Sequence, residues 1–492
     1  MAHELPLYSS EAVRSIDCAA IGLCGIEAWE LMDRAGTRAF DVLRRHWPDV
    51  QSLLVLCGPG NNGGDGYVVA RLAREAGMSV RVLVAREREG SSPEARRARA
   101  GYEQAGGAVQ VHEGMPLPQA DLIVDALFGV GLSTPPREPE AALIVAAGCH
   151  GAPVFALDVP SGLDADRGCA PGAHLAADRT ISFIAAKRGL YTGAAPALAG
   201  VVEVAALGVP EAAFEGSAAS ARLWRPGMLG ELLQRRRRDA HKGQFGHVLV
   251  VGGDHGMGGA VRIAAEAALR SGAGLVSAAT RAGHVAPLLS ARPECMAHAV
   301  ESAADLAVAL DRADVVAVGP GLGRGQWGRQ LWDRVLACEC PRVIDADALN
   351  LLAQAPQAVH GAVLTPHPGE AARLLGVDTG QVQADRFEAA AALAGRFDAV
   401  VVLKGAGTVV AAQGLVPVVI GAGNPGMAGG GMGDALTGIV AALLAQGLAA
   451  FPAAACGALL HAHAGDLAAV GGQRGLLAGD LIGRLRQAAN PQ

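Results

Sequence analysis

Aromatic residues are scarce in this chain: they make up 4% of its 492 positions, although hydrophobic residues as a group reach 51%. Any hydrophobic core must therefore be built mainly from alanine, valine and leucine. An excess of basic residues is also missing, because 41 lysines and arginines face 47 aspartates and glutamates. This mild negative charge argues against nucleic acid or an anionic membrane as a partner, since both need a positive surface. We accordingly interpret the run Arg235–Arg238 as a solvated helix face.

No CxxC pair occurs among the nine cysteines, which are scattered along the sequence. Such a set is typical of reduced thiols in the cytosol, and it argues against a zinc site. The N-terminus carries Glu4 and Glu11 and has no apolar leader segment. We therefore expect no signal peptide and a cytoplasmic location.

One long uncharged segment, residues 435–465, has the length needed to span a bilayer. Gly447 interrupts it, and Pro452 is suited to the first turn of a new helix. Alanine and glycine also dilute its hydrophobic character. We therefore expect two buried helices of a large core and no membrane span.

Length and periodicity predict more than one α/β domain. The 492 residues are about three times the size of a typical domain. Short β-rich runs alternate with helical stretches in both halves, a pattern typical of parallel sheets covered on both faces. We predict a domain at 1–215, a linker at 216–226 and a second domain at 227–492. The expected strands are 53–57, 80–84, 121–125, 153–157, 180–184, 247–251, 315–318, 342–345, 362–364 and 399–403.

Glycine is in excess, with 67 residues, about twice average usage, and many of them follow a predicted strand. In the first half, strand 53–57 leads directly into Gly58–Gly66, which begins with a GxGxxG pattern of dinucleotide-binding turns. A tight turn without a ligand is the alternative. Two features differ from an ordinary dehydrogenase: the turn contains polar acceptor side chains, and Arg86 ends the second strand where an acidic ribose ligand is usual.

Two further strands of the first half end in a carboxylate followed by a glycine turn, at Asp125 and Asp158. The carboxyl edge of an open α/β sheet is where ligands bind. Asn62, Asp125 and Ser161 together offer oxygen ligands that suit a hard cation. Asp158 is then free to act as a general acid or base.

Three motifs, NNGGDG, VDALFGVGL and DVPSGLD, together resemble the epimerase domain of the NAD(P)H-hydrate repair enzymes over about residues 10–210. The resemblance implies a Rossmann-like three-layer domain that interconverts the R and S epimers at the hydrated C6 of the nicotinamide ring. It implies a potassium ion on Asn62, Asp125 and Ser161, with Asp158 touching the substrate. Some relatives carry a lysine in the second loop, where this chain reads VGLSTPP, so the partner of Asp158 stays open. The implied substrate-binding residues are Asn61, Asn62, Gly63, Gly64, Asp65, Gly129, Val130, Gly131, Leu132, Ser133, Thr134, Pro135 and Asp158.

In the second half, a glycine-rich segment precedes a long apolar helix. Residues 429–433 expose successive amides at the helix N-terminus, which can hold a phosphoryl group or an oxyanion. Asp434, in the first turn, can accept a proton from a bound hydroxyl. A helix cap is the alternative role for Asp434, but a cap alone does not require the glycines. No Walker A loop is present, so a P-loop NTPase is disfavoured.

The second half also resembles the dehydratase domain of the same enzymes, which is ribokinase-like, over about residues 235–487. The motifs GGDHGMGGA, GPGLG, DADAL, LTPHPGE, VVLKGAGT and NPGMAGGGMGD carry this resemblance in family order. It implies dehydration of the S-hydrate at the expense of ADP, with Mg²⁺, and Asp434 as the catalytic residue. By the resemblance, the hydrate contacts are Ala260, Gly321, His367 and Asp434, and the nucleotide contacts are Lys404, Gly405, Ala406, Gly407, Thr408 and Gly433.

Three other functions stay open from the sequence. A small-molecule kinase of the hydroxymethylpyrimidine or sugar type shares the end of the second half but leaves the first half unexplained. An oxidoreductase would use the first glycine turn for a dinucleotide, without the usual acidic ribose ligand. A non-enzymatic binding protein is the third. We expect small-molecule substrates and a homo-oligomer.

Overall fold

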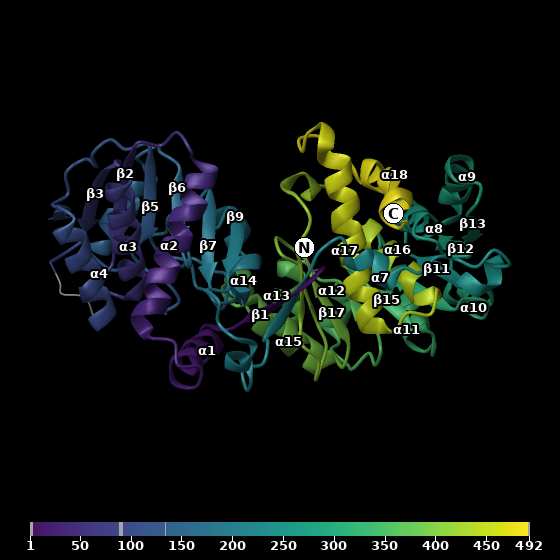
Figure 1. Cartoon of the computed structure of the whole chain (residues 1–492). Coiled ribbons are helices and arrows are strands. Elements are labelled where there is room, and N and C mark those ends of the chain that lie inside the picture. The colour runs from purple at the N-terminus through teal and green to yellow at the C-terminus, as the bar shows by residue number, and fades with distance from the viewer. Residues whose placement is uncertain (1–2, 88–91, 133, 491–492) are drawn as a thin grey trace. The chain divides into compact units, whose positions relative to one another are not determined.

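The computed structural model of the chain describes residues 3–87, 92–132 and 134–490. The chain divides into two compact units (Figure 1). Pro6–Ala221 forms one of them, here called the N-terminal unit. The residues through Leu5 and those from Arg222 onwards form the other, the C-terminal unit. The predicted linker 216–226 contains the strand β10 (Ala221–Trp224), which pairs with a strand of the C-terminal unit.

The N-terminal unit has a seven-stranded parallel sheet in the order β4-β3-β2-β5-β6-β7-β9. The chain order reverses between β2 and β5, and ligands of open α/β sheets bind outside the carboxyl ends of the strands at such a point. The strands are β2 (Ser52–Cys57), β3 (Ser79–Val84), β4 (Val109–Val111), β5 (Leu122–Ala126), β6 (Val154–Leu157), β7 (Arg179–Phe183) and β9 (Val201–Ala205), and β8 (Ala186–Lys187) pairs with the end of β1 (Glu4–Tyr8).

Helices cover both faces of this sheet, as successive side chains of each strand point in opposite directions. Leu53 and Val55 pack into a cluster with α2, α3 and α4, whereas Leu54 and Leu56 pack with α5. The predicted three-layer domain is therefore confirmed. The helices are α1 (Ser10–Gly22), α2 (Ala28–His46), α3 (Asn61–Glu75), α4 (Pro93–Gln104), α5 (Glu140–Gly148) and α6 (Ala195–Leu198).

The C-terminal unit is built on a larger mixed sheet in the order β13-β12-β11-β14-β15-β16-β17-β18-β19-β10. Pairing is parallel from β13 to β17, and β18 is antiparallel to both of its neighbours. The remaining strands are β11 (His247–Val251), β12 (Leu275–Thr280), β13 (Met296–Ala299), β14 (Val315–Val318), β15 (Arg342–Ile344), β16 (Val363–Leu364), β17 (Val400–Leu403), β18 (Val409–Ala411) and β19 (Val418–Ile420).

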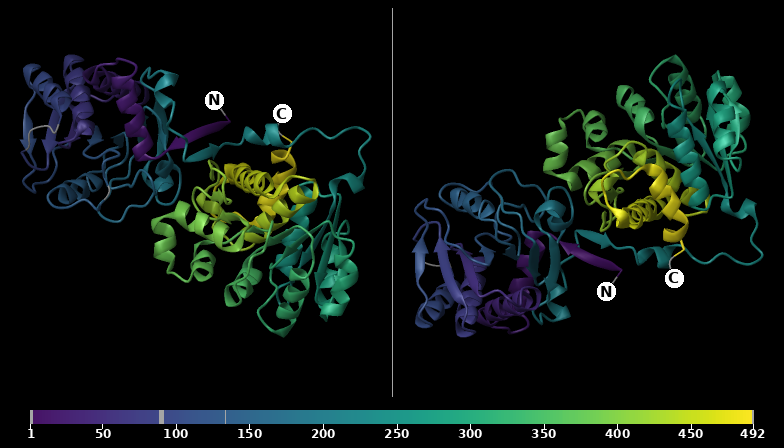
Figure 2. Two further views of the ribbon diagram at one scale, coloured as in Figure 1. Left: turned by 90° about the horizontal axis from the view of Figure 1, so that it is seen from below. Right: turned by 90° about the horizontal axis from the view of Figure 1, so that it is seen from above.

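One face of this sheet packs against four helices, which share a core of alanine, valine and leucine with alternate strand residues (Figure 2). These are α8 (Gly258–Arg270), α16 (Met432–Ala445), α17 (Ala450–Ala468) and α18 (Ala478–Ala488). The other helices are α7 (Met228–Leu232), α9 (Ala282–Ala291), α10 (Ala303–Leu310), α11 (Gln326–Leu336), α12 (Ala346–Gln354), α13 (Pro368–Leu375), α14 (Thr379–Ala384) and α15 (Arg386–Phe397), and one-turn 3₁₀ helices lie at Arg188–Tyr191, Glu211–Phe214, Lys242–Phe245, Pro425–Met427 and Ala469–Gly471.

The long uncharged segment forms the two helices that its sequence predicts. α16 ends before Gly447, and Pro452 lies in the first turn of α17. The helical stretch Ala450–Gly471 is long and apolar enough to cross a membrane, but 61% of its most apolar window is buried inside the protein. Both helices belong to the hydrophobic core of the C-terminal unit, as expected.

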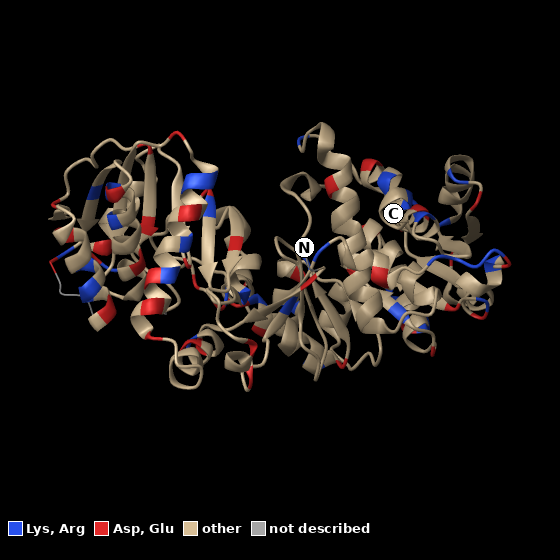
Figure 3. Ribbon diagram, viewed as in Figure 1, with Lys and Arg blue, Asp and Glu red and all other residues tan. Residues whose placement is uncertain are grey.

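Acidic and basic side chains are interspersed over each unit (Figure 3). The arginine run 235–238 lies on an exposed segment that is irregular and not helical, which corrects the predicted helix face. Within it, Arg236 stacks on Phe245 at 3.6 Å and Arg237 forms an ion pair with Asp239. These arginines are thus solvated or locally paired.

Candidate functional sites

The first site lies at the carboxyl edge of the N-terminal sheet, where three predicted cation ligands meet the turn after β5. Asp125 accepts hydrogen bonds from the Ser161 hydroxyl at 2.6 Å and from the Ser161 amide at 2.8 Å. The Phe128 amide donates to the Ser161 hydroxyl at 3.1 Å, and the Phe128 carbonyl accepts from Asn62 Nδ2 at 2.9 Å. The structure therefore brings Asn62, Asp125 and Ser161 around one turn.

The side-chain amide of Asn62 is oriented so that its oxygen, Oδ1, has no hydrogen-bond partner among the described residues. Its Nδ2 donates to two backbone carbonyls, those of Phe128 and Leu157, which fixes the amide because only the NH₂ side can donate to both. Its Oδ1 is buried. Burial also raises the pKa of Asp125. A hard cation would satisfy a buried oxygen of this kind, and Phe128 and Ser161 connect Asn62 to the buried carboxyl of Asp125, so these residues fit a potassium ion.

Asp158 follows β6 in a left-handed backbone conformation, with φ +65°, and its carboxylate forms an ion pair with Lys187. The Lys187 side chain is almost wholly buried, and its ammonium also donates to the Phe183 carbonyl at 2.7 Å. A Cβ at Gly129 would lie 3.0 Å from Asp158 Oδ2, so the predicted substrate loop passes directly over the carboxylate. Lys187 is thus the ion-pair partner of Asp158.

The sequence interpretation missed Lys187, although a signal was present. Three of the 41 basic residues are lysines, at 187, 242 and 404, and all the others are arginines. A chain that uses arginine almost everywhere keeps a lysine where a compact ammonium is needed, because the two cations differ in shape and hydration. Two of the three lysines lie in the predicted sites.

Further carboxyls surround this ion pair. Burial, followed by the charges of Asp158 and Asp17, raises the pKa of Asp65 well above its usual range. Burial and Asp158 also raise the pKa of Asp17 on α1. The site thus combines an ion-paired carboxylate with an aspartic acid whose surroundings favour the protonated form, an arrangement suited to acid–base chemistry.

The other predicted substrate-binding residues of the epimerase site differ in their contacts and in their exposure. Asn61 accepts a hydrogen bond from Ser92 at 2.7 Å, and the Val130 amide donates to Asp158 at 3.4 Å. A Cβ at Gly64 would clash with Met32, so this glycine serves helix packing. Gly63 is also buried; Gly131 and Leu132 are near the surface, and Thr134 and Pro135 are exposed. Ser133 lies outside the described residues.

The second site lies at the carboxyl ends of β15, β16 and β17, around a buried ion pair. Lys404 Nζ is 2.9 Å from Asp345 Oδ1 and 3.8 Å from Glu370 Oε2. Thr437 on α16 donates to Asp345 Oδ2 at 2.8 Å. Burial acts to raise the pKa of Asp345, but the charge of Lys404 outweighs it together with the hydrogen bonds, so the pKa is lowered. Asp345 is 1% exposed, so it orients Lys404 from beneath.

The glycine loop begins α16 directly above this pair. Gly431 is the N-cap, with φ +86° and no side-chain capping bond, so Asp434 is not the cap of the helix. A Cβ at Gly433 would lie 3.2 Å from Lys404 Nζ. Burial, then the charges of Asp345 and Asp347, raise the pKa of Asp434 to about 6, partly offset by Lys404. The loop amides, an ammonium and a proton acceptor therefore lie together.

The remaining predicted residues lie on turns or, like Ala260 of α8, in the first turn of a helix. A Cβ at Gly321 would lie 3.3 Å from Ala260 Cβ, so these two are neighbours. His367 caps α13, where its Nδ1 accepts from the Gly369 amide at 3.0 Å; burial lowers its pKa, which favours the neutral ring. Thr408 donates to the Gly405 carbonyl at 3.0 Å and closes the turn 404–408, which includes Ala406 and Gly407.

Three residues that orient the second site were not singled out from the sequence. Asp345 and Thr437 are described above, and the third is Arg386, whose buried guanidinium donates to the carbonyls of Leu403 and Lys404 at 3.0 and 3.2 Å. Asp345 lies in the quoted DADAL motif, so its strand-end position was an available signal. Arg386 and Thr437 lie within helices and had no local signal.

Comparisons with known proteins match both units. The family model described as NAD(P)H-hydrate dehydratase matches residues 248–486, and the one described as YjeF-related protein N-terminus matches residues 28–189. The solved ADP/ATP-dependent NAD(P)H-hydrate dehydratase from Bacillus subtilis, co-crystallised with ATP and Mg²⁺, is 30% identical and covers 54% of this chain and 96% of its own, with a TM-score of 0.50. A ribokinase-like superfamily protein from Enterococcus faecalis is 31% identical, with a TM-score of 0.51, over 54% of this chain and 94% of its own.

Two curated relatives match nearly the whole length. The bifunctional NAD(P)H-hydrate repair enzyme of Coxiella burnetii is 47% identical over 99% of both chains. That of Escherichia coli is 46% identical over 99% of this chain and 94% of its own. Because both units are covered in one alignment at this identity, the chain belongs to the family of bifunctional NAD(P)H-hydrate repair enzymes.

Proposed function

We propose that the N-terminal unit interconverts the R and S hydrates of NADH and NADPH, with the Asp158–Lys187 pair at its reacting centre. The C6 of the hydrate carries a hydroxyl next to the ring nitrogen. Its configuration is lost when the C–O bond breaks, with the nitrogen lone pair forming the iminium, and is reset when water adds to the opposite face. Asp158 accepts the proton of the incoming water, and Asp65 is the available donor for the leaving hydroxyl. The ion pair next to Gly129 is the observation that supports this assignment.

Potassium is part of this proposal, held by Asn62, Asp125 and Ser161. When bound, the ion supplies a fixed positive charge beside the substrate loops. The unpartnered Asn62 Oδ1 supports the assignment. Asn62→Leu should abolish the dependence of epimerisation on added potassium chloride, measured against sodium chloride at equal ionic strength. An equal potassium dependence in this variant would remove these residues as the ligands.

We further propose that the C-terminal unit dehydrates the S-hydrate at the expense of ADP, giving AMP and phosphate. Asp434 accepts the proton of the C6 hydroxyl while that oxygen attacks the terminal phosphorus of the nucleotide. The amides of residues 429–433 and the Lys404 ammonium hold the charge of the transferring phosphoryl. Phosphate then leaves C6, pushed by the ring nitrogen, and loss of a proton from C5 restores the reduced nicotinamide.

The observation that carries this second assignment is the placement of Asp434, with a pKa raised to about 6, above the Lys404–Asp345 pair. Lys404–Thr408 and Gly433 are the proposed nucleotide contacts, and Ala260, Gly321 and His367 the hydrate contacts. Magnesium enters with the phosphates, in keeping with the B. subtilis relative crystallised with ATP and Mg²⁺. A cytosolic location, supported by nine free cysteines, and a homo-oligomeric state also remain part of the proposal.

One assay tests both assignments. The purified chain is given a mixture of R- and S-hydrates with ADP, and the recovery of NADH is followed by its near-ultraviolet absorbance together with released phosphate. Nearly complete recovery is expected. Asp434→Ala should abolish it, whereas Asp158→Ala should leave repair of the S form and strand the R form. Phosphate transfer to a stable alcohol, without NADH, would instead indicate the kinase alternative.

A further inference from the structure

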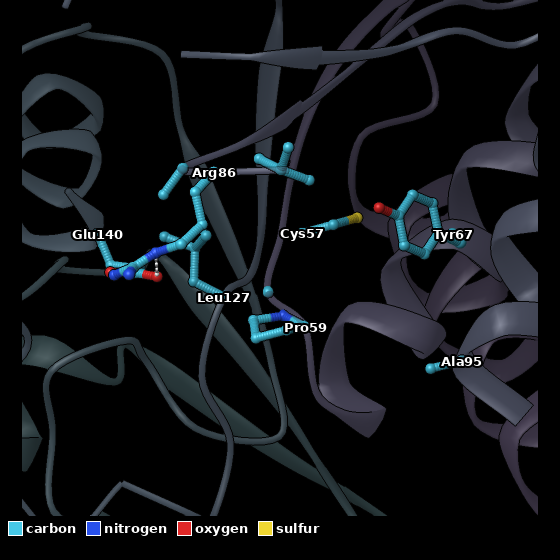
Figure 4. A pocket seen from close by; sticks show the side chains of 10 residues that line it. Cys57, Pro59, Tyr67, Arg86, Ala95, Leu127 and Glu140 are labelled. Carbon is cyan, nitrogen blue, oxygen red and sulfur yellow. Dashed lines mark hydrogen bonds and ion pairs between the residues drawn. The ribbon is translucent and has the colours of Figure 1, made fainter. Parts of the chain in front are cut away.

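A small pocket of the N-terminal unit lies beside the glycine turn and is not used by the proposed reaction (Figure 4). It opens at the carboxyl ends of β2, β3 and β5, next to the point where the strand order reverses. Figure 4 shows Arg86 and Glu140 on one side, Cys57 and Tyr67 on the other, and Pro59 and Leu127 between them. The pocket has a volume of about 20 Å³, which is enough for one small polar group. A larger ligand would lie across its mouth.

The three glycines of the GxGxxG pattern, Gly58, Gly60 and Gly63, have different surroundings. A Cβ at Gly58 would lie 1.9 Å from the Leu127 carbonyl oxygen, and one at Gly63 would lie 1.9 Å from the Gly58 carbonyl oxygen. These two are therefore required by packing. Gly60 has nothing within 4 Å of its Cβ position, so its backbone is open to a ligand at the start of α3. In dinucleotide folds the middle glycine is the one that lets the pyrophosphate approach.

Arg86 stands at the end of β3, where such folds read the 2′ position of the adenosine ribose. Its Nε donates to Glu140 Oε1 at 2.8 Å, and its Nη2 contacts Glu140 Oε2 and donates to the Glu138 carbonyl at 3.2 Å. Glu140 is mostly buried, so it holds the guanidinium by one edge. Among the described residues, no hydrogen-bond partner is found for Nη1, and the Arg86 side chain is 39% exposed.

Taken with the proposed epimerase site, we infer that the adenosine ribose of the substrate lies across this pocket and that Arg86 binds the 2′-phosphate of NADPH hydrate. The nicotinamide then lies on the opposite side of the switch point, over Asp158, and the pyrophosphate lies at Gly60. Because Glu140 and Glu138 hold the Nε and Nη2 donors, the guanidinium keeps the two N–H groups of Nη1 to donate to phosphate oxygens. The inference rests on the proposed epimerase function, and it makes Arg86 a specificity-determining residue of that site.

Kinetics of epimerisation with each hydrate test this assignment. The full chain is given the pure R-hydrate of NADH or of NADPH without ADP, so that only conversion to the S form occurs, and both forms are separated by chromatography. Arg86→Ala should raise KM for NADPH hydrate roughly tenfold or more, as expected for loss of a charged hydrogen bond. KM for NADH hydrate and both kcat values should change less than about threefold. Arg86→Lys should show an intermediate loss, because the charge remains without the planar guanidinium that Glu140 holds in place.

Arg81→Ala is the matched control, since it removes the same charge from an exposed position of the same strand, β3. It should leave all four constants unchanged. Equal rises in KM for both hydrates in Arg86→Ala would overturn the inference, as would a selective loss with NADH hydrate. Absence of epimerisation in the unmodified chain would instead refute the epimerase function itself, so the two failures are distinguishable. Unchanged kinetics with NADH hydrate check that the N-terminal unit of each variant is intact, and dehydration of the S-hydrate with ADP checks the C-terminal unit.

Discussion

Lys187 and Lys404 lie in different units, yet each forms an ion pair with one aspartate at the carboxyl edge of a sheet; Lys187 is buried and Lys404 is partly buried. An ammonium is a compact point charge that can contact a carboxylate and leave room for a reacting group beside it. A guanidinium would occupy both carboxylate oxygens in a planar fork. The near replacement of lysine by arginine elsewhere in the sequence is therefore informative about function.

Removing one partner of the first pair should destabilise the N-terminal unit and stop epimerisation. Lys187→Met leaves the Asp158 carboxylate buried without its cation, which typically costs about 3–5 kcal/mol. The double variant Asp158→Asn/Lys187→Met should recover much of that loss, because neither charge is then buried, but it should not epimerise. Denaturant unfolding followed by circular dichroism measures the stabilities. Wild-type stability in the single variant would contradict a buried, mutually dependent pair.

The pKa of Asp434 predicts how dehydration depends on pH. Its raised value of about 6 means that the carboxylate needed as proton acceptor is lost as the pH falls through about 6. The rate at saturating hydrate and ADP should therefore rise between pH 5 and pH 7 with an apparent midpoint of about 6. A flat profile over this range would argue against Asp434 as the base.

The folding stability contributed by Asp434 should change with pH in the opposite direction to the rate of dehydration. The folded-state pKa of Asp434 lies above the unfolded value, so its contribution is favourable at low pH and is lost as the pH rises through about 6. Asp434→Asn removes this titration. It should raise Tm relative to the unmodified chain more at pH 8 than at pH 5, because the unfavourable contribution grows between the ordinary pKa of 3.8 and the folded value of about 6; calorimetry measures both shifts. An increase at pH 5 alone would reverse the assigned direction of the shift.

At the scale of elements, the start of α16 is set by the close approach of its backbone to Lys404. A Cβ at Gly433 would lie 3.2 Å from Lys404 Nζ, closer than an ordinary contact, and 3.4 Å from Asp345 Oδ2. Gly433→Ala should therefore displace the ammonium by a few tenths of an ångström and lower kcat/KM for ADP at least roughly tenfold. Steady-state kinetics with S-hydrate in excess measures the effect.

The matched control for this substitution is Gly479→Ala. Gly479 occupies the same second position of α18 as Gly433 does of α16, and nothing lies within 4 Å of its Cβ position. Alanine there should leave the kinetics unchanged and, if anything, stabilise the helix slightly. Equal losses in both variants would mean that the effect comes from the helix start in general and not from Lys404.

Strands with continuous apolar runs were predictable from the sequence. Strands that depend on pairing with neighbouring strands were not. All ten predicted strands are present, because runs such as LLVLC and AVVVL are buried on both faces. Strands β12 (LVSAAT) and β13 (MAHA) were missed, since alanine and serine carry little strand signal. The short antiparallel strands β18 and β19 are held by pairing with their neighbours and by burial, which a local pattern does not reveal.

The candidate sites show the same division. Asp125 and Asp158 were identified because they end strands at the binding edge, and Asp434 because it follows a glycine-rich segment at a helix start. Lys187 was not, as it lies 29 residues beyond Asp158 and reaches it only through the packing of β6, β7 and β8. The fold class and the family resemblance are confirmed. The roles of individual residues remain predictions.

At the scale of the whole chain, the N-terminal residues through Leu5 belong to the C-terminal unit. Glu4 accepts a hydrogen bond from Trp224 Nε1 at 3.0 Å and forms an ion pair with Arg222, and all three are in the C-terminal unit. The Arg225 amide also donates to the His3 carbonyl at 3.0 Å. Each unit has its own core, so the two should unfold as separate transitions.

Glu4→Gln should therefore lower the transition of the C-terminal unit, although Glu4 lies near the start of the chain. Loss of the charged partner for Trp224 and Arg222 is worth about 1 kcal/mol, because the arginine side is exposed and its contribution small. Calorimetry with and without ADP and Mg²⁺ assigns the transitions, since a ligand raises the Tm of the unit that binds it. The ADP-sensitive transition should shift down by a few degrees in Glu4→Gln, while the other stays in place. A shift confined to the ADP-insensitive transition would place Glu4 with the N-terminal unit instead.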